Sequence, residues 1–137
     1  LTGDEEFTRM QAAKAWALWE GRTASLVSSQ ILIDYFGSAQ TALSLARIEC
    51  HYFMHQSFLK ENQILNNIEK LKGIPGVIIQ GRYDMICPME SAWELHSLWP
   101  DSKLRIIPNA GHAASEAGIS SELVQSCDQF AIDLNRK

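Results

Sequence analysis

An aspartate and a histidine follow two short apolar segments in the second half of the chain. Asp84 comes shortly after "GVIIQ", and His112 comes shortly after "LRIIP". In open α/β sheets, reactive side chains lie in loops beyond the carboxyl ends of the strands. An aspartate that accepts the Nδ1 proton of a histidine fixes its tautomer and leaves Nε2 able to act as a base. The pair therefore predicts two members of a Ser/Asp/His triad. The alternative is an aspartate in a turn and a histidine after a loop glycine.

The nucleophile of such a triad is harder to find. In α/β-hydrolases the serine lies in a G-x-S-x-G elbow upstream of both partners, and this chain has no such pattern. Ser38, in "FGSAQ", lacks the second glycine and a preceding apolar strand, and Ser120, in "GISSE", comes after His112. We therefore expect that no serine of this chain is the nucleophile.

The segments around Asp84 and His112 are expected to form a strand, a helix, a second strand and a closing helix. The β-branched run "VIIQ" is typical of a strand buried on both faces of a parallel sheet, and "KLRIIP" is the second strand. Helices are expected over 88–99 and 120–134. This order predicts an α/β fold. Two strands leave their outer edges unpaired, so we expect the sheet to be incomplete and the chain to be a piece of a longer protein.

The first half is expected to be helical. Residues 4–21 have apolar positions at helical spacing, with Thr2 or Asp4 as the cap and Gly21 as the end. Further helices are expected from Ala39 to His55 and over 58–71, whereas 25–33 fits a helix or a strand. The sequence pattern changes from helical to strand-like at "GIPG", so we expect one domain over 1–72 and another over 73–137.

Composition and charge exclude several kinds of partner. The 137 residues carry a net charge of −4 with no run of Lys and Arg, which argues against nucleic acid or an anionic membrane as a partner. No apolar stretch is long enough to span a bilayer. Three cysteines without a framework spacing indicate thiols in a reducing compartment. We expect a soluble cytoplasmic protein.

Three long motifs resemble one family. The segment from "IPGVIIQGRYDMICP" to "NAGHAASEAG", together with "AAKAWALWEG" and "ARIECHYFMH", resembles prolyl aminopeptidases (proline iminopeptidases), which are α/β-hydrolases. The resemblance covers almost the whole chain. It implies that 1–72 is a helical cap domain and that 73–137 is the C-terminal part of the hydrolase domain, with Asp84 and His112 as the triad acid and base. The elbow serine would then lie on upstream sequence.

The resemblance also implies a binding site for the substrate's amine. Glu20 and Glu49 match the family positions that bind the free amine of an N-terminal proline, and Phe53 matches a position that lines the proline-ring pocket. A cation in an apolar pocket needs an opposing charge to offset its desolvation. Without the resemblance, the two glutamates would be solvated charges near helix ends, and Phe53 would be a core aromatic.

Other residues are given smaller roles. Cys87 matches a family cysteine beside the acid, and we expect a thiol whose modification obstructs the site rather than a nucleophile. His51 and His55 are four residues apart and would lie on one face of a helix. The sequence indicates no further metal ligand near them, so we expect no metal. The chain departs from the family at Cys50, where asparagine is usual, and in "AASEAG", where the family has SAxEPG.

These observations predict a serine exopeptidase that releases proline from peptides with a free N-terminus, without a cofactor. The partners expected are the peptide substrate and the upstream half of the hydrolase domain, and a homo-oligomer is left open. The chain by itself is expected to be inactive. Two alternatives stay open: another α/β-hydrolase, such as an esterase or epoxide hydrolase, and a non-enzymatic helical binding module.

Overall fold

The computed structural model describes residues 1–135, which form two compact units. The first unit comprises residues 1–23 and 27–63, and the second comprises residues 24–26 and the chain from Ile64 onward. Most of the chain is helical, and one small parallel sheet is present. The mixed α/β class expected from the sequence is confirmed at this level.

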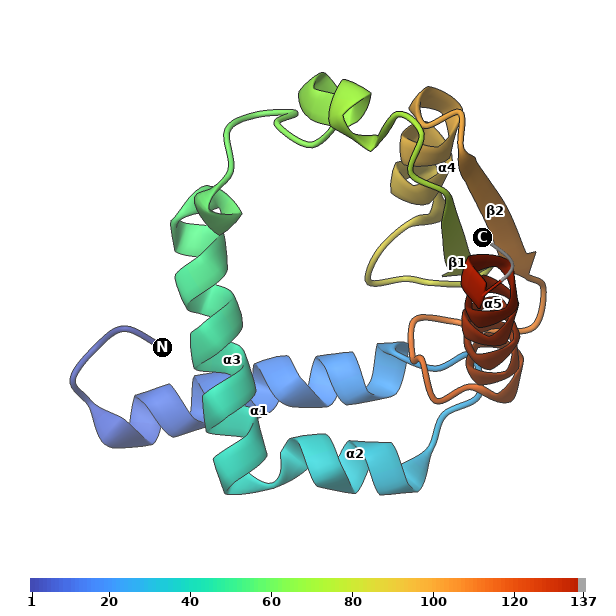
Figure 1. Ribbon diagram of the computed structural model, residues 1–137. Helices are drawn as coiled ribbons and strands as arrows, with labels where there is room; N and C mark the ends of the chain where they lie inside the picture. The colour runs from blue at the N-terminus through green and yellow to red at the C-terminus, as the bar shows by residue number, and fades with distance from the viewer. Residues whose placement is uncertain (136–137) are drawn as a thin grey trace. The chain divides into compact units, whose positions relative to one another are not determined.

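Three helices make up most of the first unit: α1 (Glu6–Thr23), α2 (Gln30–Gly37) and α3 (Ala39–Met54). Helix α3 runs across α1, and α2 packs against α1 (Figure 1). Alanines fill the core between α1 and α3, and all four are fully buried: Ala13, Ala17, Ala42 and Ala46. Because alanine is small, the two helix backbones approach closely, and larger side chains such as Trp16 and Leu43 pack around this contact.

Helix α1 begins and ends differently from its prediction. Its first turn is capped by Glu5, whose carboxylate accepts hydrogen bonds from the backbone N–H groups of Phe7 and Thr8 at 3.0 and 2.5 Å. Neither Thr2 nor Asp4 is the cap. Gly21 does not end the helix, because it is buried against α2, where an added Cβ would lie 3.1 Å from Cβ of Phe36. That glycine serves close helix packing rather than termination.

The connection between the two units was predicted as an α-helix over 58–71, and this prediction is wrong. Only short 3₁₀ turns form, η1 (Gln56–Phe58) and η2 (Leu65–Leu71). The backbone leaves helical geometry at Asn62, where φ is 53°, and again at Asn67. The ambiguous segment 25–33 contains no strand: residues 25–29 are not helical, and α2 begins at Gln30, capped by the Ser29 hydroxyl oxygen.

The second unit contains β1 (Gly76–Gly81), α4 (Met89–Leu98), β2 (Ser102–Ile107) and α5 (Ala117–Asn135), in the predicted order. The two strands pair in parallel, with Gly76 opposite Ser102 and Gly81 opposite Ile107 (Figure 1). Helix α4 packs against both strands, and α5 packs against β1. The carboxyl ends of both strands therefore meet at one edge of the sheet.

Burial in this unit is shallower than the apolar runs predicted. The central residues of β1 are half-buried rather than buried on both faces. On α5, Ile119 is buried, whereas the apolar residues Val124 and Leu134 are 59% and 68% exposed. The sheet has only two strands within residues 1–135 and offers the helix a narrow surface.

None of the described helices is both long and apolar enough to cross a bilayer.

Candidate active site

Asp84 and His112 meet at the carboxyl edge of the sheet. Strand β1 ends three residues before Asp84, and β2 ends five residues before His112. Because the strands are parallel neighbours, both loops leave the sheet at the same edge. Nδ1 of His112 lies 3.0 Å from Oδ2 of Asp84, and the aspartate side chain is 7% exposed. The structure thus brings together the acid and the base expected from the sequence.

Asp84 is held by four hydrogen bonds, two to each carboxylate oxygen. Oδ1 accepts from the backbone N–H groups of Ile86 and Cys87 at 3.0 and 2.7 Å. Oδ2 accepts from the side-chain amide of Gln80 at 3.2 Å as well as from His112. The same Gln80 nitrogen also donates to the carbonyl oxygen of Cys87 at 3.0 Å. Gln80 therefore ties the acid loop back to the strand, a role that the sequence analysis missed.

This arrangement selects one tautomer of His112. An ionised carboxylate is only an acceptor, so the ring must present Nδ1–H to Asp84. The lone pair is then on Nε2. The histidine side chain is 39% exposed, so its ring is accessible while its other nitrogen is anchored. A histidine in this state can take a proton from a hydroxyl group and return it later.

The loop that carries His112 is fastened to residues 24–26. The carbonyl oxygen of Ala24 accepts from the backbone N–H groups of His112 and Ala113 at 2.8 and 2.7 Å. The carboxylate of Glu116 accepts from Gly111 N–H at 2.7 Å and from Leu26 N–H at 3.1 Å. These contacts also escaped the sequence analysis. The one available signal was the glutamate of "AASEAG", which agrees with the family's SAxEPG although the first and fifth residues of the segment differ from it.

Gly81 permits the close approach of the two loops. A Cβ atom there would lie 1.8 Å from the carbonyl oxygen of Gly111 and 2.8 Å from that of Ala110. The backbone N–H of Tyr83 donates to the Ala110 oxygen at 3.0 Å. Only a residue without a side chain fits between the end of β1 and the His112 loop.

The other expected site residues lie in the first unit. Glu49 and Phe53 are four residues apart on α3 and share one face of that helix. Oε2 of Glu49 accepts a hydrogen bond of 2.6 Å from the indole N–H of Trp16 on α1. The rings of Trp16 and Phe53 are 6.0 Å apart, and Phe53 is 62% exposed. Phe53 is therefore a surface aromatic beside Glu49 rather than a core residue.

Glu20 lies in the last turn of α1, four residues after Trp16 and on the same helix face. It is half-buried, and its Oε2 atom is shielded from solvent. Glu20 and Glu49 each follow a fully buried alanine of the α1–α3 contact, Ala17 and Ala46, by three residues. The helix crossing therefore carries Glu20, Trp16, Glu49 and Phe53. These residues and the Asp84–His112 pair belong to different units, and each group is described by itself.

Three remaining residues of interest have contacts of their own. His51 and His55 face each other with ring centres 4.5 Å apart, and Nδ1 of His55 bonds the carbonyl oxygen of His51. No group of three or more His, Cys, Asp or Glu side chains within residues 1–135 has the arrangement of a metal site. Cys87 is exposed beside Asp84, to which its backbone N–H donates.

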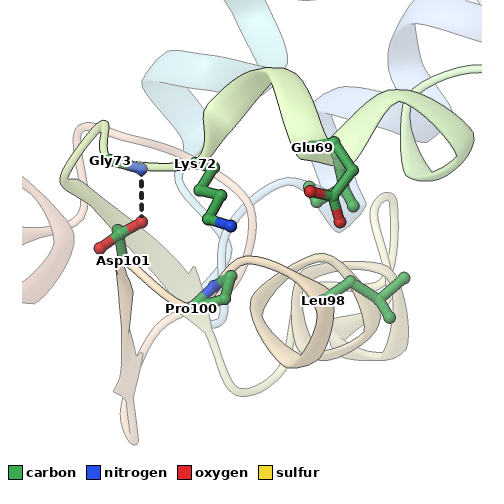
Figure 2. A pocket seen from close by; sticks show the side chains of 7 residues that line it. Glu69, Lys72, Gly73, Leu98, Pro100 and Asp101 are labelled. Atoms are coloured by element: carbon green, nitrogen blue, oxygen red, sulfur yellow. Dashed lines mark hydrogen bonds between the residues drawn. The ribbon is translucent and has the colours of Figure 1, made fainter.

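A cavity of about 430 Å³ opens at the opposite edge of the sheet. Figure 2 shows its lining, where the Asp101 carboxylate accepts a 2.7 Å hydrogen bond from the backbone N–H of Gly73. Lys72 and Glu69 contribute the other charges. Gly73 precedes β1 and Asp101 precedes β2, so this cavity lies at the amino ends of the strands. Neither Asp84 nor His112 lines it, and it has no part in the chemistry of that pair.

Comparison with known proteins gives one consistent result. A probable proline iminopeptidase from Leptolyngbya boryana is 46% identical over 131 residues, which is 95% of this chain and 41% of the relative. A proline iminopeptidase from Xylella fastidiosa is 46% identical over 95% of the chain, and one from Arabidopsis thaliana is 42% identical over 90%. No protein-family model matches the chain. The predicted resemblance is confirmed: the chain is homologous to these proline iminopeptidases over nearly all of its own length and spans 33% to 42% of theirs.

Proposed function

We propose that this chain supplies the acid, the base and the amine-binding residues of a serine exopeptidase that releases N-terminal proline from peptides. The observation that carries the proposal is the 3.0 Å contact between Nδ1 of His112 and Oδ2 of Asp84, beyond the ends of adjacent parallel strands. The names of the relatives support the substrate class. We also propose that the parent fold is an α/β-hydrolase, with residues 1–72 as its cap.

In the proposed reaction, a serine hydroxyl attacks the prolyl carbonyl carbon. Nε2 of His112 takes the hydroxyl proton as the C–O bond forms, and Asp84 stabilises the resulting imidazolium. His112 then gives that proton to the leaving amine nitrogen as the C–N bond breaks. A water molecule attacks the prolyl ester, His112 takes the water proton, and proline leaves with the serine hydroxyl restored. No step needs a metal or an organic cofactor.

Recognition of the free N-terminus is assigned to Glu20 and Glu49. A protonated proline nitrogen carries a positive charge, and a carboxylate beside it offsets the loss of water when the amine is enclosed. Phe53 is exposed next to Glu49 and offers an apolar surface for the proline ring. Two carboxylates would favour peptides with a free amine and reject peptides with a blocked one, since an acylated nitrogen carries no charge.

The nucleophile and the oxyanion hole are assigned to polypeptide outside these 137 residues. No serine in the sequence lies in a G-x-S-x-G elbow. The elbow also supplies an oxyanion-hole N–H, which stabilises the charge on the tetrahedral intermediate. We therefore propose that the chain alone has no peptidase activity. The cytoplasmic location stays a prediction.

The base is tested in the protein that contains this chain. Turnover of a chromogenic prolyl amide should fall by about 10³-fold or more in His112→Ala, because a triad acts as a unit. His55→Ala is the matched control, since this exposed histidine bonds and stacks with residues of its own segment, His51 and Phe58. Equal activity in the two variants would contradict the role of His112 as the base.

The amine site is tested with Glu20→Gln and Glu49→Gln in the same protein. Each variant should lose kcat/KM on a prolyl amide by about tenfold or more, since a charge-assisted hydrogen bond contributes about 1.5–3 kcal/mol. A simple ester without an amine should be affected much less. Equal losses on the two substrates would contradict amine recognition and favour an esterase-type α/β-hydrolase.

A further inference from the structure

We propose that Glu116 is the residue that positions His112 for its role as base. This inference rests on the proposed function, because it concerns how that base is held. Among the described residues, the Glu116 carboxylate bonds backbone N–H groups and neither Asp84 nor the His112 ring, so it acts through the backbone of the loop. It is therefore a positioning residue rather than a catalytic one.

The carboxylate of Glu116 joins two separate pieces of backbone. Oε1 accepts from the N–H of Gly111, the residue just before His112, at 2.7 Å. Oε2 accepts from the N–H of Leu26 at 3.1 Å, across 90 positions of sequence. Each oxygen accepts from its own donor, so both oxygens of the carboxylate take part in holding the loop.

The loop is fixed to the same short segment from its other side. The Ala24 carbonyl oxygen accepts from the N–H groups of His112 and Ala113. Residues 24–26 thus receive two hydrogen bonds from the loop and donate one to Glu116. The His112 backbone lies between these contacts, so neither the carbonyl nor the carboxylate can shift without moving it.

Glu116 is itself firmly placed. It immediately precedes α5, and its carbonyl oxygen accepts from Ser120 N–H at 2.9 Å as the first hydrogen bond of that helix. Its own N–H donates to the Ala113 carbonyl oxygen at 3.0 Å and closes the loop. A negative charge is also favoured at a helix N-terminus. The helix start therefore serves as the rigid point from which the carboxylate reaches back to Gly111 and Leu26.

The chemistry predicts a graded response to substitution. Glutamine has a single acceptor oxygen, and its amide group would face a backbone N–H, so Glu116→Gln keeps one of the two hydrogen bonds. Glu116→Ala keeps neither. Asp84 is not touched by either change, so the acid stays in place while the base loop loosens.

The experiment compares Glu116→Gln and Glu116→Ala in the protein that contains this chain. Glu122→Gln is the matched control, because Glu122 lies in α5, six residues after Glu116, and pairs with Arg105 at 3.5 Å, away from the loop. On a prolyl amide, kcat should fall by about 10- to 100-fold in the alanine variant with KM little changed, since a small misplacement of a reacting group costs about this much. The glutamine variant should fall between it and the wild type.

A second readout reports the histidine directly. The ¹⁵N chemical shifts of the His112 ring, assigned with a His112→Gln sample, distinguish the Nδ1–H from the Nε2–H tautomer. The Nδ1–H form should dominate in the wild type and in Glu122→Gln, and mixed tautomers should appear in the Glu116 variants. If the alanine variant does not fold, the glutamine variant decides on both readouts.

The outcomes separate this inference from the proposed function. The positioning role would be overturned if both Glu116 variants kept the tautomer populations of the wild type. Their kcat would then also lie within about twofold of that of Glu122→Gln. If the wild-type protein had no peptidase activity, the proposed function itself would be contradicted. The tautomer measurement would still show whether Glu116 holds His112 against Asp84.

Discussion

The indole nitrogen of Trp16 lies 2.6 Å from Oε2 of Glu49, so a helix-to-helix hydrogen bond orients one of the two carboxylates assigned to amine recognition. Trp16 comes from α1 and Glu49 from α3, next to their shared alanine core. A half-buried donor at this distance orients the carboxylate through Oε2, so Oε1 can face a ligand. Trp16 is therefore expected to matter for binding although it carries no charge.

Replacing Trp16 by phenylalanine should weaken substrate binding. The substitution keeps an aromatic ring beside Phe53 and removes the indole N–H. Because a hydrogen bond to a charged group contributes about 1.5–3 kcal/mol, kcat/KM for a prolyl amide should fall about tenfold or more, chiefly through KM. The measurement is steady-state kinetics on the protein that contains this chain.

Trp19→Phe is the control, since Trp19 is on the same helix and 54% exposed. It should behave as the wild type. Equal losses in the two variants would mean that the Trp16 effect comes from helix packing and not from the orientation of Glu49.

The sequence predicted the Asp84–His112 pair because the pair depends on topology. Two β-branched runs with one helix between them place both loops at the same sheet edge, whatever the details of packing. The residues that hold the pair could not be predicted in this way. Glu116 bonds Leu26, 90 positions away, and Gln80 reaches a loop whose shape depends on the fold. No periodicity encodes such contacts.

The helical predictions failed where local signals competed with packing. A glycine after a helical segment predicts a helix end at Gly21, but α2 packs against α1 there and leaves room only for a small residue. The third helix was predicted from apolar spacing over 58–71, yet the positive φ at Asn62 and the kink at Asn67 break it into short turns. Asparagine tolerates left-handed backbone, and that local preference prevailed over a weakly apolar face.

Gly81→Ala should disrupt the contact between Asp84 and His112. A Cβ atom at this position would lie 1.8 Å from the Gly111 carbonyl oxygen, so the His112 loop must move away from β1. Overpacking of this kind costs about 1–3 kcal/mol or more. We expect a lower midpoint in chemical denaturation and a loss of turnover. Gly3→Ala, where nothing lies within 4 Å of the added atom, should leave both unchanged. A Gly81→Ala protein with normal stability and activity would contradict the close approach of the two loops.

The start of α1 should depend on pH through Glu5. A hydrogen bond with the Thr8 side chain, and others from the Thr8 and Phe7 backbone N–H groups, lower the pKa of the Glu5 carboxyl below its ordinary value. Since the folded pKa is below the unfolded one, the stabilisation is complete above the unfolded value of about 4.3. It is lost as the pH falls through the folded pKa.

Cα chemical shifts of Phe7 and Thr8 across a pH titration measure this effect. They should move toward non-helical values at low pH in the wild type, whereas Glu5→Gln should show reduced helical shifts with little pH dependence. Glu6→Gln changes an acid in the same helical turn and should titrate as the wild type does. A titration that survives in Glu5→Gln would assign the cap to another group.

The 137-residue chain by itself should self-associate. Each strand has one partner within residues 1–135, which leaves an outer edge of backbone N–H and C=O groups on both. Large apolar side chains are exposed in each unit, among them Ile31 at 82% and Leu134 at 68%. Open sheet edges and apolar patches promote pairing with further copies. Size-exclusion chromatography at two concentrations should give an apparent mass that rises with concentration, together with binding of a hydrophobic dye. A single monomeric peak without dye binding would instead show that the chain covers its own surfaces, and the non-enzymatic binding module would become the better explanation.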